Sequence, residues 1–314
     1  MPAELRRVLL GMVNYLQSEQ LANGDFPYFR TSGDSFYCPC ILLSTLMHDA
    51  LGYLDPHTPL YEKTYLSDLL SKDEQRFVAA SVTGMRFRLR AFIAWQEESN
   101  GTWQLFGRES DLGPDTGATT AAAVSMLRTY PIDRRSSNRH VPIVESLLNA
   151  ELSLDEEANV LRFLVLTGRS VEDRVASFRT RLLSKDAPVE TQTEALKRLA
   201  VAYTIARAWR QAALPGRDEV AGHLVPRILS WRQAGAKFGG QLPCALSASS
   251  LVDLGCATSS LREIGKDLIS LFTESKSWRS EAFQKLEIGS AAVTVAIAIS
   301  ALVRINAQTG GSFC

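Results

Sequence analysis

Apolar residues recur every three or four positions along almost the whole chain, and clean alternation with a period of two is nearly absent. The first spacing places apolar side chains on one face of an α-helix, whereas alternation would indicate strands. It predicts helices over Leu5–Leu21, Ile41–Leu51, Val78–Trp95, Ala118–Leu127, Ala158–Leu166, Val171–Leu183, Ala195–Ala213, Val220–Arg232, Leu242–Leu254, Leu261–Phe272 and Ser290–Ile305. Gly and Pro mark many of the breaks between them. The sequence therefore predicts an all-α protein.

One pattern recurs where predicted helices end. Each copy has a Gln near the end of a helix, a Gly that permits a left-handed turn, and an aromatic residue that folds back. The copies are Leu16-x3-Gln20-x3-Gly24-x-Phe26 and Phe92-x3-Gln96-x4-Gly101-x-Trp103, with weaker ones at Lys237-Phe238-Gly239-Gly240 and Ser277-Trp278. A small apolar helix follows each copy. Such repeated pairs predict an α/α barrel, a ring of paired inner and outer helices. No linker divides the chain, so we expect one domain over residues 1–314.

The charge of the chain bears on its partners, and its cysteine content bears on its cellular compartment. The chain has 34 basic and 34 acidic side chains, and its formal net charge is zero. It carries no large basic block, so we expect no nucleic-acid partner. The short basic clusters at residues 86–90 and 134–139 are explained by solvated helix faces or loops. Five cysteines, an odd number without a disulfide framework, favour a reducing cytosol and predict a cytoplasmic protein.

No stretch of the sequence reaches the ~18 charge-free apolar residues of a membrane span. The nearest, Ile288–Ile305, is rich in Ala, Ser and Gly and predicts a tightly packed internal helix. Glu4, Arg6 and Arg7 interrupt the N-terminal region, where a signal peptide would need an apolar core. We therefore expect no integral membrane segment and no signal peptide.

A single carboxylate, Asp115, stands just before the small, weakly polar helix predicted from Ala118. Asp is among the commonest N-cap residues, so a purely structural role is one interpretation. The other is chemical. A carboxyl group surrounded by apolar walls keeps its proton, and a helix N-terminus stabilises the anion that is left when the proton is given up. Local sequence alone favours the cap.

Four stretches resemble class II terpene cyclases, the squalene–hopene cyclase group. The repeats resemble the Gln-x-Gly-x-Trp repeats of that group. The other stretches are Pro114-Asp115-Thr116-Gly117-Ala118-Thr119-Thr120-Ala121, Leu154-Asp155-Glu156-Glu157-Ala158-Asn159-Val160-Leu161 and Gly289-Ser290-Ala291-Ala292-Val293-Thr294. They resemble the Pro-Asp-x-Asp-Asp-Thr-Ala motif, an Asp-x-x-x-Asn-Ala-Asn-Val-Leu run and a Gly-Ser-x-x-x-Thr-Thr-Ala run. At this length the chain is most similar to single-domain cyclases of the merosterolic acid synthase type.

The resemblance has one departure. The middle Asp of the family motif is the proton donor in the larger cyclases, and here Gly117 stands at that position. Ala118 stands at the third Asp, so only Asp115 remains. Single-domain relatives are thought to work with one Asp in such a run. The resemblance therefore implies that Asp115 is the acid, about half a helical turn away from the family position.

The resemblance also implies roles for neighbouring residues. Asn159 would hold the Asp115 carboxyl group in its reactive orientation, although a plain core amide is an equal alternative. Thr119 and Thr120 would supply nearby hydroxyls. Asp155 is expected to be the N-cap of the helix that carries Asn159. Asp111 is a second candidate acid in the same loop as Asp115, and is better explained as an exposed loop residue.

Aromatic faces stabilise carbocations, so the implied cavity needs an aromatic wall. The candidates are Phe29, Phe36, Tyr37, Trp95, Trp103, Tyr203, Trp209, Trp231, Phe238 and Trp278. Any one of them is more often core than cavity lining, and Trp103 and Phe26 could be staples between helices. Termination needs a base that the sequence does not identify.

The implied function is a cofactor-independent class II terpene cyclase. It would protonate the terminal alkene or epoxide of a polyprenyl chain and drive cationic ring closure. We expect a prenylated aromatic acid, taken up through transient membrane contact, with Arg86, Arg90 or Arg232 receiving its carboxylate. A prenyl diphosphate is the alternative substrate, and Mg²⁺ would matter only there.

Three other functions are alternatives to this one. A catalytically inactive barrel that binds a hydrophobic ligand is the main alternative, and the lost Asp pair supports it. Prenyltransferase β-subunits hold zinc in a related barrel, but here no His follows Asp253 and Cys256, so we expect no metal. A carbohydrate-active barrel ranks last, because it needs paired carboxylates and the sequence offers none near the aromatic set.

Overall fold

The computed structural model describes residues 2–30, 37, 39–127, 134–184, 191–236, 240–274 and 288–310. Within these residues it has thirteen α-helices and one 3₁₀ helix, so the expected all-α class is confirmed. Of the residues proposed for the site, Phe36, Phe238 and Trp278 lie outside the described part of the chain.

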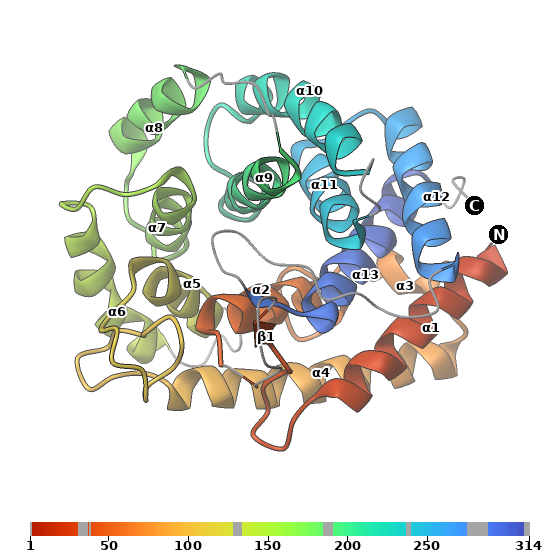
Figure 1. Ribbon diagram of the computed structural model, residues 1–314, viewed down its shortest axis with the longest axis horizontal. Helices are drawn as coiled ribbons and strands as arrows, with labels where there is room; N and C mark the ends of the chain where they lie inside the picture. The colour runs from red at the N-terminus through yellow and green to blue at the C-terminus, as the bar shows by residue number, and fades with distance from the viewer. Residues whose placement is uncertain are drawn as a thin grey trace.

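The longer helices are arranged in an inner and an outer layer (Figure 1). The inner helices are α2 (Ile41–Leu51), α5 (Thr116–Leu127), α7 (Leu154–Leu166), α9 (Gln192–Ala212), α11 (Gln241–Leu254) and α13 (Ala291–Gln308). The outer helices are α1 (Pro2–Glu19), α4 (Lys72–Trp95), α6 (Arg134–Leu147), α8 (Glu172–Ser184), α10 (Arg217–Ala236) and α12 (Thr258–Glu274). Each inner helix contacts the next one in chain order, and α13 contacts α2, which closes the circuit.

Small elements join the two layers. The 3₁₀ helix η1 (Gly52–Leu54) continues α2, and α3 (Thr64–Ser67) contacts α13. Strand β1 (Phe29–Arg30) pairs antiparallel with β2 (Ile288–Gly289), which ties the segment after α1 to the entrance of α13. Each strand has only two residues, which is too few to show alternation with a period of two in the sequence.

Burial explains the composition of the inner helices. Every residue of α11 is buried, and so is nearly every residue of α2 and α13. Among the described helices, α13 alone is long and apolar enough to cross a membrane, and 83% of its apolar window is buried inside the protein. The expectation of a packed internal helix in this region is confirmed.

Helix α6 was not predicted from the sequence. It begins with Arg134 and Arg135, and Pro142 lies inside it. A proline removes one backbone donor and normally ends a helix, and a run of arginines hides the apolar spacing. The helix is held by packing against α5 and α7 instead.

The repeated turns use Gly and Gln as the sequence indicates. Gly24 and Gly101 have φ angles of 91° and 81°, the left-handed region that glycine tolerates best. A Cβ on Gly24 would lie 2.5 Å from the carbonyl oxygen of Arg88, so a side chain has no room there. The Gln20 side chain donates to the carbonyl oxygens of Gly24 (2.8 Å) and Met85 (2.9 Å). This amide therefore fastens the turn to the outer helix α4.

A buried carboxyl group follows the first of these turns. Asp25 has no exposed surface, and it accepts hydrogen bonds from the hydroxyls of Tyr37 (2.8 Å) and Ser44 (2.8 Å). Burial raises its pKa from 3.8 to about 6, and these hydrogen bonds only partly oppose the effect. The native state therefore binds a proton at Asp25 more tightly than the unfolded chain does.

This difference predicts a pH-dependent stability. The favourable contribution of protonated Asp25 is complete below pH 3.8 and is lost as the pH rises through about 6. The loss amounts to about 3 kcal/mol in the free energy of unfolding. In Asp25→Asn, which cannot ionise, that loss should disappear. Urea unfolding of both proteins from pH 4 to 7.5 tests this, and parallel stability curves over that range would contradict it.

A layer of buried ion pairs lies at the C-terminal ends of the inner helices. Arg162 and Arg207 both pair with Asp49, the second at 3.3 Å, and Arg304 pairs with Asp253. All five side chains are at most 4% exposed. Arginines near helix C-termini are favoured by the helix dipole, whereas aspartates there are not. Each aspartate therefore depends on its arginine partners.

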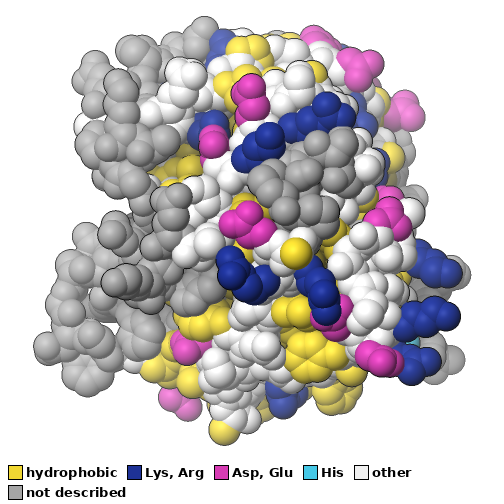
Figure 2. Space-filling model, turned by 90° about the vertical axis from the view of Figure 1, so that its right-hand side faces the viewer, with side chains coloured by type: hydrophobic (Ala, Val, Ile, Leu, Met, Phe, Trp, Pro, Cys, Tyr) yellow, Lys and Arg dark blue, Asp and Glu magenta, His cyan; other side chains and the backbone are white. Residues whose placement is uncertain are grey.

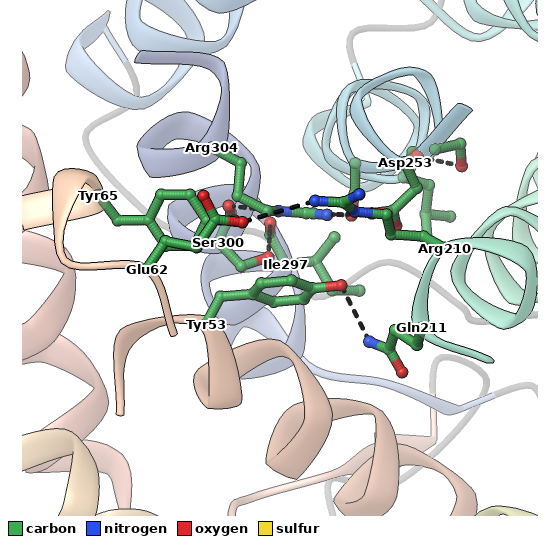
Figure 3. Close-up of polar contacts among 12 residues, drawn as sticks. Tyr53, Glu62, Tyr65, Arg210, Gln211, Asp253, Ile297, Ser300 and Arg304 are labelled. Atoms are coloured by element: carbon green, nitrogen blue, oxygen red, sulfur yellow. Dashed lines mark hydrogen bonds and ion pairs between the residues drawn. The ribbon is translucent and has the colours of Figure 1, made fainter. Parts of the chain in front are cut away.

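Aromatic and polar groups complete this ionic layer. The Arg304 guanidinium lies over the Tyr53 ring, with its Cζ 4.1 Å from the ring centroid. Tyr53 accepts a hydrogen bond from the Gln211 amide at 2.9 Å. Figure 3 shows these side chains converging from α9, α11, α13 and the chain that follows α2. Five inner helices are thereby connected at one end: α2, α7 and α9 through Asp49, and α11 and α13 through Asp253.

The surface carries charges of both signs. On the face that presents α1 and α12, basic and acidic side chains are interspersed between small hydrophobic patches (Figure 2). No large single-sign area is visible among the described residues of that face, which agrees with the zero net charge.

Candidate functional site

The start of helix α5 is positioned by the segment that precedes it. Trp103 is fully buried, its indole N–H donates to the carbonyl oxygen of Ile93 (2.8 Å), and its ring lies against His140. The carbonyl oxygen of Trp103 accepts the backbone N–H of Asp115 at 2.9 Å. Trp103 was predicted to face substrate. Instead it packs between helices and fixes the backbone position of Asp115.

Asp115 is both a helix cap and a perturbed acid. Its Oδ1 accepts the backbone N–H of Ala118 at 2.7 Å, as an N-cap does. The residue is half-buried. Burial raises the pKa of its carboxyl group, the Ala118 hydrogen bond opposes that rise, and the nearby Glu156 charge adds to it. One oxygen of Asp115 therefore caps the helix, while burial shifts the ionisation of the group toward higher pH.

Asp115 opens onto a cavity of about 280 Å³. We call this the Asp115 cavity. Its described lining comes from α2, α5, α7, α9 and the segments before them: Leu42, Leu105, Asp115, Gly117, Ser153, Asp155, Glu156, Asn159, Lys197, Val201 and Thr204. The cavity lies at the N-terminal ends of α5 and α7, whereas the ionic layer lies at the opposite, C-terminal ends of the inner helices.

Asn159 lines the same cavity, so the two residues proposed as a catalytic pair lie at one site. Asn159 is 4% exposed, and its Oδ1 has no hydrogen-bond partner among the described residues. No hydrogen bond joins its side chain to Asp115 within that part of the chain. A buried, unpaired acceptor is costly, so a ligand hydroxyl or a protonated carboxyl group at this point would be stabilised by it.

Two further carboxylates line the cavity, which the sequence interpretation did not foresee. Asp155 was expected to cap α7, but the cap is Ser153. Glu156 completes a capping box with Ser153, accepting its backbone N–H at 2.9 Å. Asp155 stands in the first turn and lines the cavity instead. These neighbouring acids make ionisation of Asp115 more costly.

Thr119 and Thr120 were predicted to supply hydroxyls near Asp115. Both hydroxyls instead form hydrogen bonds with the backbone. The Thr119 hydroxyl exchanges hydrogen bonds with the backbone of Trp103, accepting its N–H at 3.0 Å. The Thr120 hydroxyl donates to the carbonyl oxygen of Thr116 at 2.9 Å. Both side chains are buried and brace the first turns of α5. The donor that reaches Asp115 is a backbone N–H.

None of the aromatic residues proposed for the wall is among the described lining of the Asp115 cavity. Trp95 is 60% exposed on α4, and Tyr37 is 39% exposed and bonded to Asp25. Tyr203 and Trp209 are buried in the core, where Tyr203 lies beneath Arg207 and Trp209 packs on Phe178. The side chain of Phe29 is not described.

Trp231 lines a different and larger space. This second cavity, of about 530 Å³, lies between α7, α8, α9 and α10, and we call it the Trp231 cavity. Lys197 and Val201, one turn apart on α9, line both cavities. Lys197, which is exposed, was not predicted to line a cavity, because a single lysine on an amphipathic helix is ordinarily only a solvated side chain.

The arginines proposed to receive a carboxylate have other partners. Arg86 is buried, pairs with Asp55 and donates to the carbonyl oxygen of His48 at 2.9 Å. Arg232 pairs with Asp267. Neither residue, nor Arg90, is among the described lining of the Asp115 cavity.

Comparison with known proteins does not assign the chain to a family. No family profile matches the sequence. No curated protein matches it either. A structural match covers 91% of this chain and 19% of the other chain, at 14% sequence identity and a TM-score of 0.41. That structure is the crystal structure of Salmonella alpha-2-macroglobulin reacted with methylamine. The chain thus spans about a fifth of the length of the protein it resembles.

Proposed function

We propose that the two helical layers form an α/α barrel and that the protein is a class II terpene cyclase. In this proposal Asp115 protonates the terminal alkene or epoxide of a polyprenyl chain. A prenylated aromatic acid is the substrate class we favour. The resemblance of four sequence stretches to such cyclases motivates the proposal, and the environment of Asp115 supports it.

One observation carries the proposal: a half-buried carboxyl group with a raised pKa opens onto a cavity at a helix N-terminus. Proton transfer to an alkene needs an acid that is neutral before the reaction and whose anion is stabilised afterwards. Burial and the acidic neighbours favour the first state. The Ala118 N–H, 2.7 Å from Oδ1, and the positive end of the α5 dipole favour the second.

In the proposed first step, the proton given to the substrate comes from Asp115 itself. The Asp115 O–H bond breaks while a C–H bond forms at the terminal alkene carbon, which leaves a carbocation on the chain and a carboxylate at Asp115. The next double bond attacks the cation and closes a ring. Loss of a proton from the final cation to a base or water ends the sequence. In this proposal Asn159, which lines the same cavity, holds the Asp115 carboxyl group in its reactive orientation.

The proposal is tested by turnover. Purified protein is incubated with farnesylated and geranylgeranylated hydroxybenzoic acids and with the matching diphosphates, and products are identified by mass spectrometry and NMR. Cyclic products isomeric with the substrate, formed without added metal or cofactor, are expected. Recovery of unchanged substrate in every case would contradict the proposal.

The neighbouring acid predicts a shift in the pH profile. Glu156→Gln keeps the capping box, because Gln serves at that position, but it removes the charge that raises the Asp115 pKa. The pKa of Asp115 should fall. Since only the protonated acid reacts, activity should be lost at a lower pH than in the wild type. Glu151→Gln, an exposed neighbour outside the cavity lining, is the control. An alkaline limb that stays in place in Glu156→Gln would rule out this coupling.

A second candidate is an inactive barrel that binds a ligand. The lack of aromatic residues in the described lining favours it, because carbocations are best stabilised by aromatic faces. Tight binding of a prenylated acid together with no turnover of any substrate would identify this function.

A further inference from the structure

The Trp231 cavity combines apolar walls with cationic groups. Leu182, Ile205, Leu224 and Trp231 contribute apolar surface. Its volume of about 530 Å³ is within the range of roughly 300–1,000 Å³ found for ligand sites. Such a space suits a ligand that is largely hydrocarbon.

The cations in the lining are Lys197 and Arg198 on α9 and Arg227 on α10, with His223 one turn before Arg227. None of the described lining residues is acidic. Arg198 is paired with Glu194 at 2.5 Å and lies over the Trp231 ring, 5.9 Å from its centroid. Lys197 lies on α9 and Arg227 on α10, where the Arg227 guanidinium also donates to the carbonyl oxygen of His223 at 2.8 Å.

Lys197 occupies a special place among these groups. It lines both cavities, and it forms no hydrogen bond or ion pair with the described residues. Its neighbour Val201 also lines both and is apolar. An anion next to Lys197 would therefore lie where the two linings share residues.

We propose that the Trp231 cavity binds the anionic head group of an amphipathic ligand, whose hydrocarbon chain passes Val201 and reaches Asp115. Lys197 and Arg227 hold the head group through charge-assisted hydrogen bonds. This inference rests on the proposed function for the destination of the chain. It assigns the binding of the anion to α9 and α10, in place of the arginines predicted from the sequence.

Binding without turnover tests the inference. Isothermal titration with a farnesylated hydroxybenzoic acid and with its methyl ester separates charge from hydrocarbon. The acid should bind at least about tenfold more tightly, because the ester cannot form the charged contacts. Farnesyl diphosphate is the third probe. If it alone shows the cation dependence, the head group is a diphosphate and not a carboxylate.

Matched variants locate the site. Lys197→Gln and Arg227→Gln should each bring the affinity for the acid close to that for the ester, with the ester unaffected. Lys266→Gln, an exposed lysine on α12 outside both cavities, should change neither. Equal affinities of acid and ester together with no cation dependence of the diphosphate, or unchanged binding of every probe in both cavity variants, would overturn the inference. Asp115→Asn should retain charge-dependent binding, so a failed cyclisation assay and a failed head-group site give different results.

Discussion

Replacing Asp115 with asparagine should lower the rate of cyclisation by about 10²- to 10⁴-fold, the range that a positioned proton donor contributes. Asparagine has nearly the same shape and is itself a good N-cap, so the hydrogen bond from the Ala118 N–H can be kept. The variant loses only the acidic proton. The initial rate of product formation at saturating substrate measures this, with circular dichroism to verify the fold.

Asp111→Asn is the matched control for this variant. Asp111 stands four residues earlier, is exposed, and is not among the described lining of the Asp115 cavity. The same chemical change there should leave the rate near that of the wild type. Wild-type rates in Asp115→Asn would mean that another group supplies the proton.

The second large effect concerns stability. Replacing Asp253 with asparagine should lower the free energy of unfolding by about 3–5 kcal/mol, because Arg304 is left as a buried charge without its counter-ion. That is a large part of the roughly 5–15 kcal/mol by which domains are stable. Urea denaturation measures the change, and loss of the folded protein on expression would be its extreme form.

A surface ion pair provides the comparison. Asp267 is 55% exposed and pairs with Arg232, so Asp267→Asn should cost no more than about 1 kcal/mol. A double variant, Asp253→Leu with Arg304→Met, removes both buried charges and should recover part of the lost stability. Equal costs for Asp253→Asn and Asp267→Asn would show that the ionic layer does not hold the inner helices together.

Much of the helical architecture can be predicted from the sequence because its cause is local. Apolar spacing identified eleven of the described helices, including α2 with its exact bounds and α13 within three residues at each end. Gly24 and Gly101 identified left-handed turns, since only the backbone is involved. Helix α6 was missed because Pro142 and its arginines hide the pattern, and its formation depends on neighbours.

The site was predicted only in part. Asp115 and Asn159, proposed from motifs far apart in the chain, do line one cavity. The aromatic residues could not be sorted, because a tryptophan that packs between helices and one that faces a cavity have the same local sequence. Trp103 and Trp231 illustrate this difference. The role of Lys197 depends on which helices flank α9, which no local pattern encodes.

The ionic layer was not predictable for a related reason. Asp49, Arg162 and Arg207 are separated by up to 158 residues, and each alone resembles a solvated charge on an amphipathic helix. Only the closed circuit of inner helices brings them together. Asp253 and Arg304 show the same effect.

The most direct test of Asp115 as the proposed acid is the pKa of its carboxyl group. Protein labelled with ¹³C at aspartate carboxyl carbons can be titrated by NMR, and the Asp115 signal is assigned by its absence in Asp115→Asn. If Asp115 is the acid, we expect a pKa above the ordinary value of 3.8, and a further rise when a prenylated ligand displaces water from the cavity. A pKa at or below 3.8, unchanged by ligand, would mean that Asp115 is only a helix cap and would contradict the proposed acid.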